Sequence, residues 1–159
     1  MLNITGQTTL GVHIRGTDHP DEVEQVSFER ILRLILKGAR KYKKIFVATD
    51  DHQVLARLEQ ELGKDRLIFQ DAIRSKDHQA VHTNMSHTNR YRLGLEVLAD
   101  GYALSACDKA ILVHSNVSYG ALLLNPELNY TLLETGSSKR KRLMTSILYF
   151  LDQWGIRKM

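Results

Sequence analysis

Short apolar runs and helix-type patterns alternate along most of this chain, and the alternation limits the folds open to it. Five runs have the length and residue types of strands, namely 9–14, 44–48, 66–70, 109–114 and 130–134. Apolar residues at helical spacing mark five further segments, namely 27–42, 52–62, 91–107, 115–125 and 143–154. Strands that are joined through helices run parallel, and the helices cover the faces of the sheet. The sequence therefore predicts an α/β fold, a Rossmann-like parallel sheet with flanking helices.

The size and composition of the chain suit one soluble globular domain. Hydrophobic residues make up 43% of the sequence and charged residues 25%, which are ordinary values for a globular protein. A chain of 159 residues can bury a core of its own, so we expect a single domain over 1–159. No apolar run approaches the ~20 residues of a membrane-spanning helix. Residues 1–9 also lack the pattern of a signal peptide, so we expect a cytoplasmic location.

The formal net charge of +4 permits an anionic ligand without naming one. Much of the excess lies in one run, Lys139-Arg140-Lys141-Arg142. No aromatic residue is interleaved there to stack on bases, so we expect a solvated connection and no nucleic-acid partner. The single cysteine, Cys107, cannot form an internal disulfide. Its place at the end of an apolar helical pattern predicts a buried structural thiol.

Polar side chains follow three of the predicted strands at the points where these strands end. They are His13, Arg15, Thr17 and Asp18 after the first strand, Thr49, Asp50 and Asp51 after the second, and Ser115 and Asn116 after the fourth. The carboxyl ends of parallel strands meet at one edge of a sheet, where ligands of open α/β folds bind. A helix that starts at this edge directs backbone N–H groups toward it. The sequence therefore predicts an anion site, most naturally for phosphate, with His13 and Arg15 on one face of their strand.

The ordered motifs resemble a known family. His13-Ile14-Arg15 followed by Thr17-Asp18 is similar to the first motif of the fucosyltransferase superfamily that includes the α1,6-fucosyltransferases, NodZ and the protein O-fucosyltransferases. The strand that ends in Thr49-Asp50-Asp51 resembles the second strand of the α1,6 enzymes. Further similar positions are Asn89, Arg90, Tyr91, Asp100, Asp108, Ser115 and Asn116, and the resemblance covers about 11–134. Residues 115–121 also resemble a segment of α1,2-fucosyltransferases, so the linkage class stays open.

The resemblance implies the donor-binding domain of a GT-B glycosyltransferase, with GDP-fucose as donor and inverting transfer of fucose to a glycan or another hydroxyl acceptor. It makes Arg15 the catalytic residue, which would hold the β-phosphate and stabilise the charge that grows on it. His13 would fix the nucleotide, and Asp100 would accept hydrogen bonds from two donors of guanine. The remaining donor-binding residues implied by the resemblance are Asp18, Asp50, Asp51, Ser115 and Asn116.

The resemblance also implies which components lie outside this set of residues. No metal or other cofactor is expected, and the acceptor side would belong to an N-terminal domain outside this chain. The general base would be Asp21, Glu22 or a residue elsewhere. Gly16 stands where the α1,6 enzymes have a second arginine, so their acceptor specificity does not transfer.

Alternatives from other classes stay open at this stage. The domain could be a non-catalytic nucleotide-sugar-binding module, or a metal-dependent hydrolase with His13, Asp18 and His19 as ligands. The histidines at 78, 82 and 87 invite a metal interpretation, although their segment lacks helical patterning. Single residues have structural alternatives too: Asp50, Asp51 or Asn116 could cap a helix, and Asp100 could be a surface acid. The sequence contains neither G-x-G-x-x-G nor the P-loop pattern, which disfavours a dinucleotide dehydrogenase and a P-loop nucleotidase.

Overall fold

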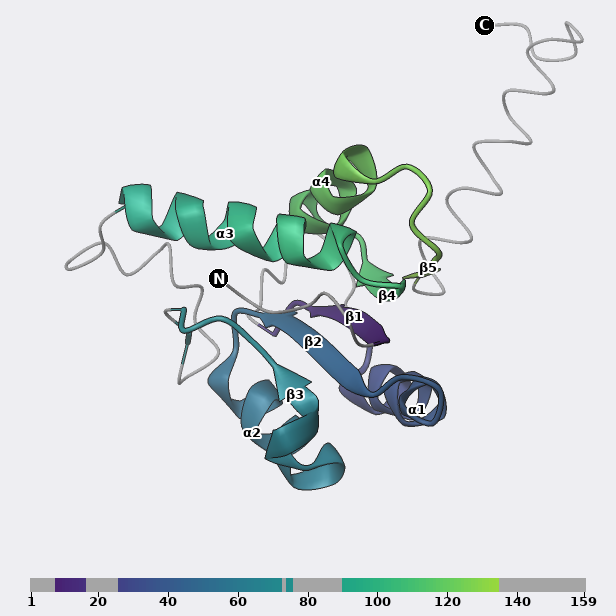
Figure 1. Cartoon of the computed structure of the whole chain (residues 1–159). Helices are drawn as coiled ribbons and strands as arrows, with labels where there is room; N and C mark the ends of the chain where they lie inside the picture. Colours follow the sequence, from purple (N-terminus) through teal and green to yellow (C-terminus); the bar gives the residue numbers. More distant parts are fainter. Residues whose placement is uncertain (1–7, 17–25, 73, 76–89, 135–159) are drawn as a thin grey trace, which may run out of the picture.

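The computed structural model describes residues 8–16, 26–72, 74–75 and 90–134 (Figure 1). Its strands are β1 (Thr9–Ile14), β2 (Lys44–Thr49), β3 (Leu67–Ile68), β4 (Lys109–Val113) and β5 (Tyr130–Leu133). Its helices are α1 (Phe28–Ala39), α2 (His52–Leu62), the short 3-10 helix η1 (Lys64–Arg66), α3 (Arg90–Ser105) and α4 (Asn116–Leu124). The five strands form one parallel sheet in the order β3-β2-β1-β4-β5. This order reverses at β1, as in Rossmann-like folds, so the predicted fold class is confirmed.

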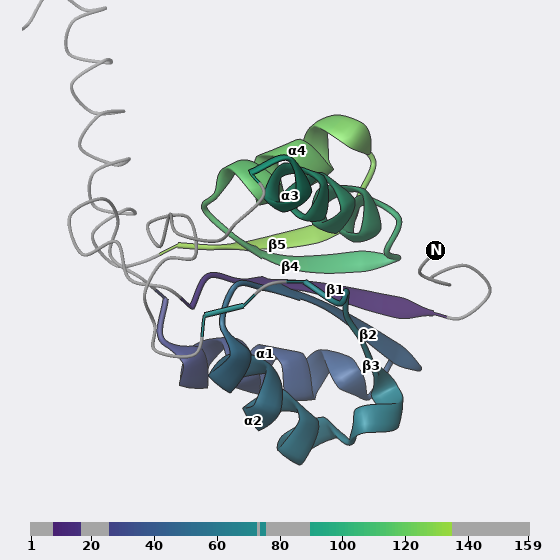
Figure 2. The same ribbon diagram turned by 90° about the vertical axis from the view of Figure 1, so that its left-hand side faces the viewer.

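The helices cover the two faces of the sheet. α1 and α2 lie on one face, and α3 and α4 lie on the other (Figure 2). This division follows from the strand order, because the chain builds β1, β2 and β3 toward one edge and then crosses back to build β4 and β5. The polar segments that follow β1, β2 and β4 therefore meet at one edge, as predicted.

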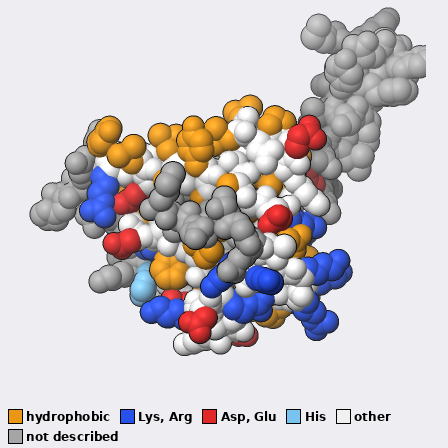
Figure 3. Space-filling model, viewed as in Figure 1, with side chains coloured by type: hydrophobic (Ala, Val, Ile, Leu, Met, Phe, Trp, Pro, Cys, Tyr) orange, Lys and Arg blue, Asp and Glu red, His pale blue; other side chains and the backbone are white. Residues whose placement is uncertain are grey.

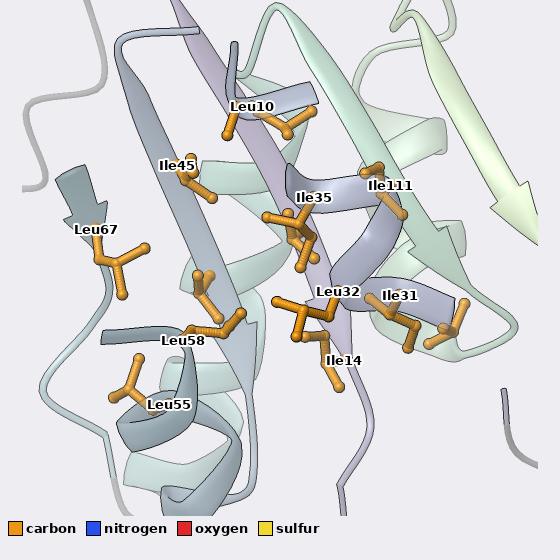
Figure 4. Packing of buried hydrophobic residues seen from close by; sticks show 14 of the residues in the cluster. Leu10, Ile14, Ile31, Leu32, Ile35, Ile45, Leu55, Leu58, Leu67 and Ile111 are labelled. Atoms are coloured by element: carbon orange, nitrogen blue, oxygen red, sulfur yellow. The ribbon is translucent and has the colours of Figure 1, made fainter. Parts of the chain in front are cut away.

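Alternating side chains of the strands fill a core on each face. Leu10, Val12 and Ile14 of β1 pack in the cluster under α1 and α2, where isoleucines and leucines from helices and strands meet (Figure 4). Phe46 of β2 and Leu104 of α3 belong to the cluster on the other face. Strands that are buried on both faces read as nearly continuous apolar runs, which is why their pattern was clear in the sequence.

The third predicted strand is much shorter than expected. Residues 66–70 were predicted as a strand, but only Leu67 and Ile68 pair with β2, at the edge of the sheet. Arg66 is held instead by the end of α1 and the segment that follows it, where its guanidinium donates to the carbonyl oxygens of Ala39 and Tyr42. The predicted helix over 143–154 lies outside the described residues.

The predicted structural role of Cys107 is confirmed. Its thiol is buried and donates to the carbonyl oxygen of Ala103 at 3.2 Å. Burial, reinforced by the nearby Asp108 carboxylate, raises the pKa of the thiol to about 12, so it is inert at neutral pH. Within the ranges given above, none of the helices has both the length and the apolar character needed to cross a membrane.

Candidate functional site

A cavity of about 390 Å³ opens at the carboxyl ends of β1, β2 and β4. Six of the donor-binding residues that the resemblance implies line it, namely His13, Arg15, Asp50, Asp100, Ser115 and Asn116. The rest of the wall is formed by Thr49, Ala72, Leu93, Glu96, Val97 and Val117. Its volume lies within the range of small-molecule sites. The fold therefore brings together residues from β1, the turn after β2, α3 and the start of α4.

Among the described donor-binding residues that were predicted, Asp51 does not line this wall. Asp51 is buried and caps α2, with its Oδ1 accepting a hydrogen bond from the backbone N–H of Gln53 at 2.7 Å. For Asp51 the structure thus shows the helix-capping alternative, because the carboxylate is turned toward its own helix. Asp18 lies outside the described residues. The same is true of Thr17, His19, Asp21, Glu22, His78, His82, His87 and Asn89.

The turn after β1 is packed tightly against the turn after β2. The backbone N–H of Gly16 donates to Oδ1 of Asp50 at 2.8 Å. A Cβ atom built on Gly16 would lie 2.2 Å from Cβ of Asp51, a distance that no side chain can accept. This packing explains why a glycine follows Arg15.

His13 is the centre of a buried polar cluster. Its Nδ1 lies 2.8 Å from Oγ of Ser118 and 3.1 Å from Oγ of Ser115. Burial lowers the pKa of His13 from 6.5 to about 4, an effect that Asp50 opposes and Arg15 reinforces. The ring is therefore neutral at pH 7, and the positive charge on this side of the cavity belongs to Arg15.

Ser118 is a residue that the sequence argument did not single out. It is fully buried in α4, and its backbone N–H donates to Oγ of Ser115 at 3.1 Å. Ser115 is thus the N-cap of α4, whereas Asn116, which the sequence suggested as a cap, is the first residue of the helix. The contact of Ser118 with His13 depends on how β1 and α4 meet in the fold.

Asp100 lines the cavity from α3 and is held by Gln70, which follows β3. Oδ1 of Asp100 accepts a hydrogen bond from Nε2 of Gln70 at 2.7 Å. Burial raises the pKa of Asp100 from 3.8 to about 6, although the bond from Gln70 and the charge of Arg74 act to lower it. Gln70 was also missed, because it follows a short strand in a segment without a recognisable motif. Asp100 is thus a partly buried acid at the cavity and not a freely exposed one.

The described residues contain no group of three or more histidine, cysteine or acidic side chains that could hold a metal ion. Asp18 and His19, which the hydrolase alternative requires, lie outside them. A scan against models of known protein families and a search among curated proteins both find no match to this chain. The geometry of the cavity is therefore what bears on its function.

Proposed function

We propose that this domain binds GDP-fucose and forms the donor-binding half of a fucosyltransferase-like glycosyltransferase of GT-B type. Fucose is transferred, with inversion at the anomeric carbon, to a hydroxyl group of an acceptor, most simply a glycan. The proposal rests on one observation, that Arg15 and Asp100 line the same cavity although they come from separate parts of the chain. A cation suited to phosphate and a carboxylate suited to guanine therefore face one space.

Arg15 is assigned to the diphosphate. It shares the cavity wall with Asn116 and Val117, the first two residues of α4. A helix N-terminus favours negative charge, and a guanidinium group can bind two phosphate oxygens at once. As the bond between the anomeric carbon and the β-phosphate oxygen breaks, negative charge grows on the phosphate, and Arg15 stabilises it. The neutral ring of His13 adds hydrogen bonding at this place without further charge.

Asp100 is assigned to the guanine base. A carboxylate can accept hydrogen bonds from both the ring N–H and the exocyclic amine of guanine, which lie on one edge of the base. Gln70 fixes the direction of the Asp100 carboxylate through the 2.7 Å bond to Oδ1. Leu93 and Val97 in the same wall supply apolar surface for the plane of the base. The cavity wall thus carries a cation for the diphosphate and a carboxylate for the base.

A nucleotide-sugar-binding module without turnover is the second candidate, and a specific observation favours it. Each of the three carboxylates in the cavity wall has a donor of its own: Gly16 for Asp50, Gln70 for Asp100 and Arg92 for Glu96. A general base must be able to reach the proton of the acceptor hydroxyl. If the complete protein supplies no further base, the domain binds the donor and transfers nothing.

The deciding experiment is calorimetric titration of the full chain with GDP, GDP-fucose and ADP, with and without excess chelator. We expect GDP and GDP-fucose to bind more tightly than ADP, with the same Kd in chelator, because the phosphate charge is met by Arg15 and α4. Absence of GDP binding would contradict the proposal. Binding that is lost in chelator and restored by a divalent cation would support the hydrolase alternative instead.

A further inference from the structure

α3 carries apolar side chains on two opposite sides. Ala103 and Leu104 face the sheet and belong to a core cluster. On the other side lies a row that we call the α3 stripe, formed by Tyr91, Leu95, Leu98 and Tyr102. Their exposed fractions are 73%, 47%, 61% and 62%. Spacings of four, three and four residues place all four side chains in one narrow band along a helix.

The apolar surface continues from the α3 stripe onto the neighbouring helix. Leu123 of α4 is 82% exposed, and Tyr119 and Leu124 are exposed as well. Hydrophobic side chains gather along this part of the surface, over α3 and α4 (Figure 3). α4 contains no charged residue. Side chains of this size present an area on the order of 800 Å², which is what each partner contributes to a standard protein interface and more than monomers usually expose.

The α3 stripe reads the same in both directions. Its residues are Tyr, Leu, Leu, Tyr, and its spacings are four, three, four. In a two-fold symmetric dimer, one patch meets its own copy, so a contact between two positions occurs twice. Two antiparallel α3 helices with the axis between Leu95 and Leu98 would set tyrosine against tyrosine and leucine against leucine.

Charged groups do not interrupt the stripe. Nε of Arg92 and Oε1 of Glu96, one turn apart beside the stripe, are 2.9 Å from each other. Charged residues are depleted at the centre of protein interfaces and tyrosines are enriched there. The α3 stripe has this composition. Because the stripe also matches itself under a two-fold axis, a second copy of it is a suitable partner.

We propose that this chain forms a two-fold symmetric dimer through the α3 stripe, with the two α3 helices antiparallel. Tyr91 of one subunit packs against Tyr102 of the partner subunit, and Leu95 packs against Leu98 of the partner subunit. The dimer does not depend on the proposed function, because Asp100 and the cavity lie on the inner side of α3.

The first test is the mass of the full chain by sedimentation between about 1 and 100 µM. We expect twice the monomer mass of 18.2 kDa. Leu98→Glu should weaken association at least ~100-fold, as loss of a central contact does. Leu36→Glu is the matched control, because Leu36 is also exposed but belongs to α1 on the opposite face. If the chain stays monomeric at all these concentrations, whether its stripe is covered by another part of itself or free, the proposal is overturned. An equal effect of both substitutions on association overturns it as well.

Cross-linking tests the antiparallel geometry in the otherwise unchanged protein. Tyr91 and Tyr102 are about 16 Å apart along α3, whereas a disulfide needs Cα atoms within about 7 Å. Tyr91→Cys mixed with Tyr102→Cys should therefore form a covalent dimer under a mild added oxidant, and each variant alone should not. The buried Cys107 stays inert. Covalent dimers of Tyr91→Cys alone, or none in the mixture, overturn the antiparallel pairing.

Discussion

Nδ1 of His13 lies 2.8 Å from Oγ of Ser118, a residue 105 positions away in the sequence. This contact joins the end of β1 to the first turn of α4, the two elements that carry Arg15 and Asn116 to the cavity. Because the ring is buried, protonating it costs free energy in the folded state that it does not cost in the unfolded chain. The stability of the domain is thereby linked to pH through its candidate site.

His13 and Asp100 change the free energy of unfolding with pH in opposite directions. The pKa of His13 falls from 6.5 to about 4 on folding. Its contribution to the stability of the fold is therefore complete above pH 6.5 and is lost as pH falls toward 4. The pKa of Asp100 rises from 3.8 to about 6, so its contribution is complete below pH 3.8 and is lost as pH rises toward 6. Between pH 5 and 7 the two changes are about +2 and about −1 kcal/mol in the free energy of unfolding. They largely cancel in the parent protein.

A variant that removes one of the two groups should show the pH dependence of stability that the other group causes. From pH 5 to pH 7 we expect Asp100→Asn to gain about 2 kcal/mol in the free energy of unfolding and His13→Gln to lose about 1. Urea unfolding of the parent and both variants at the two pH values measures this, and all other titrating groups cancel in the comparison. Parallel changes in all three proteins would show that neither group is perturbed as described.

Gly16 gives the second prediction. Gly16→Ala places a methyl group 2.2 Å from Cβ of Asp51, so the two turns must separate, at a cost of about 1–3 kcal/mol in stability. The bond from Gly16 to Asp50 should weaken with them, and GDP affinity should fall. Gly120→Ala is the control, because nothing lies within 4 Å of its Cβ position in α4. There alanine should be neutral or stabilise by about 0.5–1 kcal/mol, as thermal unfolding can measure.

The strands and their parallel direction were predictable, because buried parallel strands leave an almost continuous apolar run, as in Ile45–Ala48, and because helices alternate with them. The edge of the sheet where the cavity opens was predictable for the same reason, since it depends only on the direction of the strands. The order of the strands in the sheet was not predicted. The shortness of β3 was not predictable, because an edge strand pairs on one side only and Arg66 is held by the end of α1 and the segment that follows it.

The partners of the site residues were less accessible from sequence. Gln70 belongs to no motif, and the resemblance of 115–121 did not single out Ser118. Their bonds to Asp100 and His13 cross 30 and 105 positions. Asp50 and Asp51 are neighbours with the same side chain, yet one lines the cavity and the other caps α2. The direction of each carboxylate is decided by the backbone at the end of β2, which the sequence pattern does not specify.

Arg15 gives the third prediction. Arg15→Lys keeps the positive charge but loses the planar fork that can bind two phosphate oxygens. We expect turnover of GDP-fucose to fall about 10²–10³-fold, as for loss of one preorganised charge stabiliser, with a smaller change in GDP affinity. Arg33→Lys on the exposed side of α1 is the control. GDP release from GDP-fucose by the full chain, with a glycan acceptor present, measures the effect, and unchanged turnover in folded Arg15→Lys would remove the catalytic assignment.

The fourth prediction concerns the choice of base by Asp100. Guanine offers two adjacent donors to one carboxylate, whereas adenine lacks that pair, so the parent protein should bind GDP more tightly than ADP. Asp100→Asn replaces one acceptor by a donor that would face a guanine donor, and a buried polar group left without its partner is costly. The preference for GDP over ADP should fall by about 1–3 kcal/mol.

Asp65→Asn, on the exposed η1 segment, is the control for Asp100→Asn and should leave this preference unchanged. Titrating both nucleotides into all three proteins at pH 7.5, above the raised pKa of Asp100, separates base recognition from protonation. Equal affinity of the parent for GDP and ADP would leave Asp100 as a partly buried acid held by Gln70, with no part in reading the base.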